Sequence, residues 1–108
     1  MASLNYLTKE VNMKTLALDI GGTNIRSAIV QGAKLKDYQK VKTPKKKAGV
    51  IKKLFDVVGE YGKVDAICVS TAGFERNGRI VNSLNNDMDG TALTKILKAR
   101  FGKKVYVE

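Results

Sequence analysis

Residues 16–30 read Leu-Ala-Leu-Asp-Ile-Gly-Gly-Thr-Asn-Ile-Arg-Ser-Ala-Ile-Val. Two apolar runs flank a Gly-Gly-Thr-Asn turn, a pattern that indicates a β-hairpin with buried strands. A carboxylate at the end of such a strand is costly to bury unless it meets a cation or several hydrogen-bond donors. We therefore predict that Asp19 is a ligand of Mg²⁺.

The four turn residues suit a phosphate group. Gly21 and Gly22 permit positive φ and let backbone N–H groups come close to a ligand, while Thr23 and Asn24 add polar side chains without bulk. We predict that these four residues bind phosphate. Taken alone, the residues leave a purely structural alternative open, in which Gly-Gly forms an ordinary hairpin turn and Asp19 caps it.

The composition bounds the class of protein. A chain of 108 residues, 44% of them hydrophobic, suits one domain with a single core. The net charge of +10 comes mostly from lysines spread along the chain, with few Arg and no Trp, so we expect a solvated basic surface and no nucleic-acid partner. No apolar run is long enough for a membrane helix or a signal peptide, and we expect a cytoplasmic protein without a membrane partner.

Hydrophobic periodicity predicts the element order β, β, β, α, β, α, β. The predicted strands cover 14–20, 25–31, 35–43, 64–70 and 103–108. The first three form an antiparallel meander, and the strongly apolar fourth returns parallel to the first. One helix follows Pro44 and ends at Gly62, a second covers 91–101 and ends at Gly102, and residues 71–78 are a loop. Cys68 is predicted to be a core thiol.

Residues 19–26, Asp-Ile-Gly-Gly-Thr-Asn-Ile-Arg, resemble the first phosphate motif of the ROK family of bacterial sugar kinases, in the actin and hexokinase superfamily. The resemblance covers 14–108 and leaves 1–13 as an N-terminal extension. It implies an α/β, ribonuclease-H-like mixed sheet, in which a three-stranded antiparallel meander precedes parallel strands with crossover helices. It also implies that the chain is the N-terminal fragment, about a third, of a glucokinase-like, ATP-dependent sugar (hexose) kinase of carbohydrate metabolism that uses ATP and Mg²⁺.

A second motif, Val-Ser-Thr-Ala-Gly at 69–73 followed by Asn-Gly-Arg-Ile at 77–80, resembles the ROK segment that leaves room for a sugar. Gly73 is therefore a predicted substrate-binding residue, and this strand end and the Gly-Gly turn are expected to approach one ligand. The family usually carries an Asn followed by Trp, with the Asn binding a sugar hydroxyl. This chain has no Trp, and Asn85 is the candidate, although Asn-Asn-Asp also fits a turn or a helix cap.

The resemblance places the family's general base just beyond Glu108, so we assign no catalytic residue within the chain and expect it to be inactive alone. Arg26 is expected to face either a phosphate or a surface partner. An apolar sheet face is expected to be exposed, and we predict self-association through it or docking of residues 1–12 over it.

Two other classes of function stay open. A ROK-type transcriptional regulator needs a winged-helix module of several dozen residues, whereas about 13 residues precede the first predicted strand. A non-catalytic interaction or scaffold module built on half a kinase fold is the stronger alternative. The sequence does not decide which sugar is the substrate, or whether ATP or another compound is the phosphoryl donor.

Overall fold

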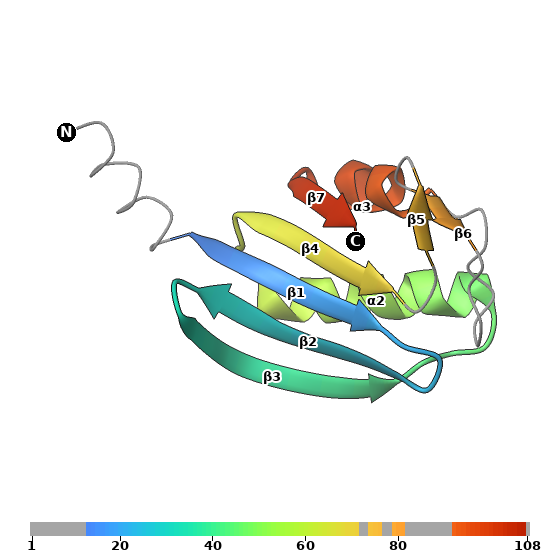
Figure 1. The fold of residues 1–108 in the computed structure, drawn as a ribbon, viewed down its shortest axis with the longest axis horizontal. Coiled ribbons are helices and arrows are strands. Elements are labelled where there is room, and N and C mark those ends of the chain that lie inside the picture. The colour runs from blue at the N-terminus through green and yellow to red at the C-terminus, as the bar shows by residue number, and fades with distance from the viewer. Residues whose placement is uncertain (1–12, 72–73, 77–78, 82–91, 108) are drawn as a thin grey trace.

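A computed structural model describes residues 13–71, 74–76, 79–81 and 92–107. Its main sheet has five strands in the order β3-β2-β1-β4-β7 (Figure 1). These strands are β1 (Lys14–Ile20), β2 (Asn24–Gln31), β3 (Lys34–Lys42), β4 (Ala66–Thr71) and β7 (Lys104–Val107). The helices within the described residues are α2 (Lys47–Tyr61) and α3 (Leu93–Phe101). Neither helix has the length and apolar character needed to cross a membrane.

The sheet is mixed, as predicted. β1, β2 and β3 pair antiparallel, β4 runs parallel to β1, and β7 runs parallel to β4. At the start of β1 and β4, the Lys14 N–H donates to the Asp65 carboxylate and the Asp65 N–H donates to the Lys14 carbonyl, each at 2.8 Å. These two bonds help to set the β1–β4 register on which the candidate site depends.

Both helices pack on one face of the sheet, behind the strands in Figure 1. On β1 this face carries Leu16, Leu18 and Ile20, all almost fully buried. The rest of the core comes from both helices and the neighbouring strands: Ile25, Ile29, Val50, Leu54, Val57, Val58, Val64, Ile67, Val69, Leu93, Leu97 and Val105. The rings of Phe55 and Phe101 join the two helices in an edge-to-face contact, with centroids 5.8 Å apart.

The helix ends follow the sequence signals. α2 begins shortly after Pro44 and ends at Gly62, whose φ of 71° is easy for glycine and strained for other residues. α3 ends at Gly102, which adopts the left-handed conformation with φ 65° and donates its N–H to Lys98. The predicted ends at Gly62 and Gly102 are confirmed.

The prediction of a loop over 71–78 is wrong in part. β5 (Phe74–Arg76) and β6 (Arg79–Val81) pair antiparallel as a separate two-stranded sheet. Strands of three residues are too short to show a period of two, which is why the periodicity missed them. Their register leaves Asn77 and Gly78 between the paired Arg76 and Arg79, and Asn-Gly is the signal that could have found this hairpin.

Candidate functional site

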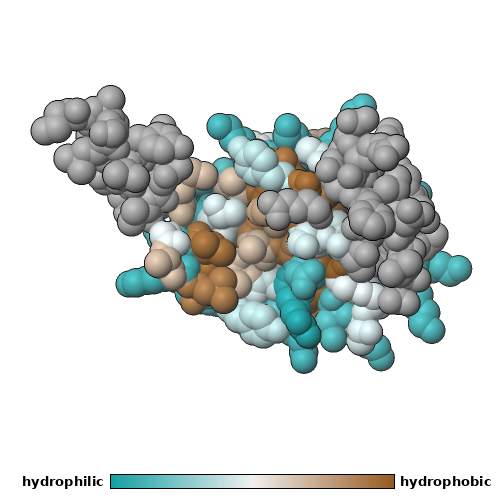
Figure 2. Space-filling model, in the orientation of Figure 1, coloured by the Kyte–Doolittle hydropathy of each residue, from teal (hydrophilic) through white to brown (hydrophobic). Residues whose placement is uncertain are grey.

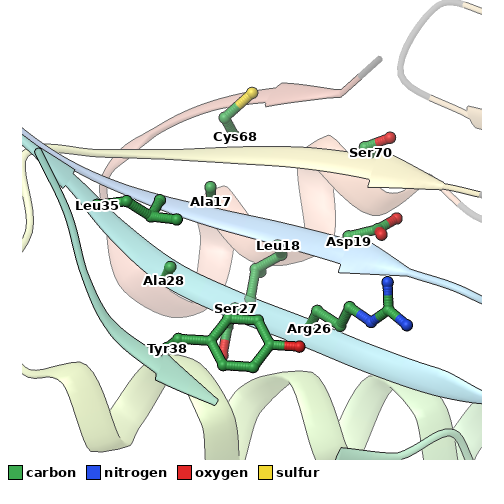
Figure 3. A pocket seen from close by; sticks show the side chains of 10 residues that line it. All are labelled: Ala17, Leu18, Asp19, Arg26, Ser27, Ala28, Leu35, Tyr38, Cys68 and Ser70. Carbon is green, nitrogen blue, oxygen red and sulfur yellow. The ribbon is translucent and has the colours of Figure 1, made fainter. Parts of the chain in front are cut away.

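Three polar residues lie side by side on the face of the sheet opposite the helices. Asp19 on β1 pairs with Arg26 on β2 and with Ser70 on β4, and residues in register project to the same face. All three are exposed, and Figure 3 shows them together at one end of the strands. This end is the carboxyl end of the parallel pair β1 and β4, where open α/β sheets bind ligands.

The physical reason given above for a cation at Asp19 does not hold, because Asp19 is exposed. β1 alternates between the two faces, with Leu18 and Ile20 buried toward the helices and Asp19 on the open side. Among the described residues, Asp19 makes no hydrogen bond or ion pair, although Arg26 stands opposite it. Its carboxylate oxygens are therefore accessible to a ligand.

A single accessible carboxylate fits Mg²⁺ that arrives with a phosphate. Mg²⁺ keeps several waters and is commonly held by one or two carboxylates together with substrate phosphate oxygens. Within the described ranges, no group of three or more His, Cys, Asp or Glu residues gathers in one place. That part of the chain therefore fits a metal shared with a phosphate ligand better than a metal held by protein alone.

The Gly-Gly turn is closed by a hydrogen bond from the Gly21 N–H to the Asn24 carbonyl, at 2.9 Å. The glycines that adopt positive φ, among those described, are Gly32, Gly62 and Gly102, so neither turn glycine uses the positive φ that we expected to favour it. Gly21 is needed for space instead, since a Cβ there would lie 3.0 Å from the Asn24 carbonyl oxygen.

Thr43, which the sequence analysis missed, holds this turn from the end of β3. Its N–H donates to the Thr23 carbonyl and its Oγ1 donates to the Gly21 carbonyl, both at 2.9 Å. The side chain is buried. The sequence does offer a signal, a polar β-branched residue directly before Pro44. Proline restricts the preceding residue to extended backbone, and the branched Cβ restricts χ1, so the Thr43 hydroxyl is held in a defined position.

Two amides of the turn have no hydrogen-bond acceptor among the described residues. In the part of the chain that the structure describes, neither the Gly22 N–H nor the Thr23 N–H donates a hydrogen bond. Successive backbone N–H groups of this kind are donors that suit phosphate oxygens. Asp19 and the four predicted phosphate ligands thus lie together, whereas the predicted sugar ligands Gly73 and Asn85 fall outside the described residues.

An apolar hollow of about 250 Å³ extends from this polar end along the open face (Figure 3). Its apolar lining comes from four strands: Ala17, Leu18, Ala28, Leu35, Tyr38 and Cys68. Leu35 and Tyr38 are 66% and 59% exposed. Cys68 is half-buried here, so the prediction of a core thiol is wrong; its register partner is Ala17, on the side away from the helices.

The chain is similar to known sugar kinases. No model of a known protein family matches the sequence. It is 35% identical to the N-acetylmannosamine kinase of Haemophilus influenzae over 94 residues, which are 84% of this chain and 31% of the relative. A ROK family glucokinase from Streptomyces griseus, solved with glucose and AMPPNP, superposes with a TM-score of 0.80 and 27% identity over 88% of this chain and 32% of that one. The predicted relationship to the ROK family is confirmed.

The ROK relationship also confirms the ribonuclease-H-like, actin-type fold class. The chain spans about a third of the length of the curated ROK relatives that it matches. A ROK family transcriptional regulator, a homologue of the E. coli MLC protein, has the same fold, with a TM-score of 0.81 at 15% identity over 91% of this chain and 28% of that one. The fold therefore does not separate kinase from regulator, whereas the relative with 35% identity is a kinase.

Proposed function

We propose that this chain forms the phosphoryl-donor side of an ATP-dependent sugar kinase that acts in the cytoplasm. The observation that carries the proposal is the juxtaposition, at the carboxyl end of β1, of an accessible carboxylate, Asp19, with the amides of Gly22 and Thr23, which donate no hydrogen bond to any described residue. Relatives with this fold support it, because the similar glucokinase was solved with the nucleotide AMPPNP.

Each residue has a distinct proposed role. Asp19 holds Mg²⁺ directly or through water, and the turn amides donate to the phosphates of ATP. Arg26 lies level with Asp19 on the same face, which favours phosphate as its ligand over a surface partner. Phosphoryl transfer depends on positioning and on neutralising charge from several sides at once. The proposed Mg²⁺, amides and guanidinium together would supply one side of that arrangement.

The sugar is proposed to be a hexose or an N-acetylhexosamine, in line with the glucokinase and N-acetylmannosamine kinase relatives. Gly73 and Asn85 stay predicted contacts to it. We expect nucleotide binding by these 108 residues but no sugar phosphorylation, because they supply only one side of the reaction. Phosphorylation of glucose or N-acetylmannosamine by the purified chain at rates typical of kinases would contradict that expectation.

The test is a titration of the ¹⁵N-labelled chain with ATP, with and without Mg²⁺. We expect shifts confined to the amides of residues 19–26 and Ser70, with affinity strengthened by Mg²⁺. In Asp19→Asn the Mg²⁺-dependent gain should disappear, a loss of roughly tenfold for one lost charge-assisted contact. Asp56→Asn is the matched control, since Asp56 is exposed on α2 and the substitution changes the charge equally.

A different result would favour another class of function. If no amide shifts up to millimolar Mg·ATP, the Gly-Gly motif here marks the fold without binding nucleotide. The non-catalytic scaffold would then be the better proposal. If shifts appear but Asp19→Asn leaves the Mg²⁺ dependence unchanged, the turn binds phosphate and Asp19 is not the metal ligand.

A further inference from the structure

We propose that Thr43 is a positioning residue that orients the Gly22 amide toward the nucleotide phosphates. This inference rests on the function proposed above and assigns a role to a residue outside the Gly-Gly motif. Its basis is the peptide unit that joins Gly21 to Gly22, whose carbonyl accepts a hydrogen bond from the buried Thr43 hydroxyl, directly after the end of β3.

The geometry of the peptide bond transmits this contact. In a trans peptide the C=O of one residue and the N–H of the next lie in one plane and point in opposite directions. The chain has no cis peptide bond among its described residues. Because the Thr43 Oγ1 holds the Gly21 carbonyl at 2.9 Å, the Gly22 N–H of the same unit points away from Thr43.

This peptide unit needs an external contact to stay in one orientation. Residues without a Cβ flank it on both sides, so the backbone dihedrals that let a peptide plane rotate meet little steric resistance. The hydrogen bond from the Gly21 N–H to Asn24 fixes the preceding peptide unit, not this one. Among the described residues, the bond from Thr43 is the contact that fixes the Gly21 carbonyl.

Thr43 is suited to the task because it is itself rigid. Its side chain is 7% exposed, its β-branched carbon restricts χ1, and Pro44 restricts its backbone to extended conformations. Its own N–H also donates to the Thr23 carbonyl, which fixes the far side of the turn. The hydroxyl is thus held in place by the sheet and can set the turn without being part of it.

The test compares Thr43→Val, which keeps the shape and the backbone bond but removes the hydroxyl donor, with Thr43→Ser, which keeps the hydroxyl. Thr15→Val is the control, since Thr15 lies at the opposite end of β1 and has no side-chain hydrogen bond among the described residues. Thr43→Ser and Thr43→Ala form a second pair, which differs only in the hydroxyl oxygen and serves if Thr43→Val does not fold.

The first readout needs no nucleotide. In Thr43→Val, and not in Thr43→Ser or Thr15→Val, the Gly22 amide resonance should shift and broaden, while the resonances of amides elsewhere in the sheet stay unchanged. An unchanged Gly22 amide in Thr43→Val would overturn the proposal, whether or not the chain binds ATP.

The second readout is the affinity for Mg·ATP, measured where all variants are fully folded. We expect Thr43→Val to bind roughly tenfold more weakly, the effect of one misplaced phosphate contact, and Thr43→Ser to stay within about threefold of the parent chain. Equal affinity in Thr43→Val would overturn the role in nucleotide binding. If the parent chain binds no Mg·ATP, the proposed function itself fails, and the Gly22 amide alone then decides whether Thr43 orients the turn.

Discussion

The two faces of the main sheet differ in what their residues do. Toward the helices, β1 and β4 present Leu16, Leu18, Ile67 and Val69, all buried. One position along, the same strands present Ala17, Asp19, Cys68 and Ser70 to the open face, where Figure 2 shows apolar patches amid hydrophilic side chains. Adjacent residues of one strand thus serve stability and the candidate site separately. Substitutions on the two faces should therefore have separable effects.

The largest expected effect is on the helix-covered face. Leu16 is fully buried between neighbours on β2 and β4, so Leu16→Ala leaves a cavity and should lower the free energy of unfolding by about 2–5 kcal/mol. Urea unfolding followed by far-UV circular dichroism measures the loss. Such a change is a large fraction of the stability of a small domain.

The matched substitution on the open face is Leu35→Ala, at a side chain that is 66% exposed. It should change the free energy of unfolding by less than about 0.5 kcal/mol, as at other exposed positions. If Leu35→Ala costs as much as Leu16→Ala, the open face is covered in solution and the contrast between the faces fails.

Two glycines of α2, the helix that packs on the covered face, should respond to alanine in opposite directions. A Cβ at Gly49 would lie 2.9 Å from the Pro44 Cβ, so Gly49→Ala should destabilise the chain by about 1–3 kcal/mol through overpacking. A Cβ at Gly59 meets nothing within 4 Å, and Gly59→Ala should stabilise it by about 0.5–1 kcal/mol because alanine favours helix. Thermal unfolding of both variants checks the signs; destabilisation by both would show that the spacing at Pro44 is not the cause.

A smaller loss of stability is expected where a side chain of α2 is hydrogen-bonded to the edge strand β3. The Tyr61 hydroxyl, at the end of α2, donates to the Asp37 carbonyl at 2.7 Å and is hydrogen-bonded to the buried Ser27 hydroxyl at 2.9 Å. Asp37 has a φ of 56°, at an irregularity of β3. Tyr61→Phe should lower the free energy of unfolding by about 1 kcal/mol.

Tyr106→Phe is the control for this hydroxyl, because Tyr106 is 55% exposed on β7 and forms no hydrogen bond among the described residues. The free energy of unfolding of Tyr106→Phe should match that of the parent chain within the error of denaturant titration. An equal loss in both variants would mean that removing a phenolic hydroxyl, rather than the bonds to Asp37 and Ser27, causes the change.

The contrast between faces also explains what the sequence could predict. Apolar runs and glycine signals report local structure, so the order of the five strands of the main sheet and the two helices, and the helix ends at Gly62 and Gly102, follow from them, whereas the short strands β5 and β6 do not. Burial of Asp19 was predicted on the assumption that β1 is buried on both sides, whereas β1 alternates between a covered face and an open face, and Asp19 lies on the open one. Thr43 was missed because its role depends on the pairing of β3 with β2, which brings residues 20 positions apart together.

The smallest effect concerns the open face itself, where we propose weak self-association through Leu35 and Tyr38. Apolar exposure favours contact between two copies, but each chain carries a net charge of +10 and repels the other. Salt screens that repulsion, so the associated fraction should rise with ionic strength. Sedimentation velocity at low and high salt measures it. The double variant Leu35→Ser/Tyr38→Ser should stay monomeric at high salt. Ala48→Ser, a control on the exposed side of α2, should associate as the parent chain does. A parent chain that is monomeric at every salt concentration would rule this contact out.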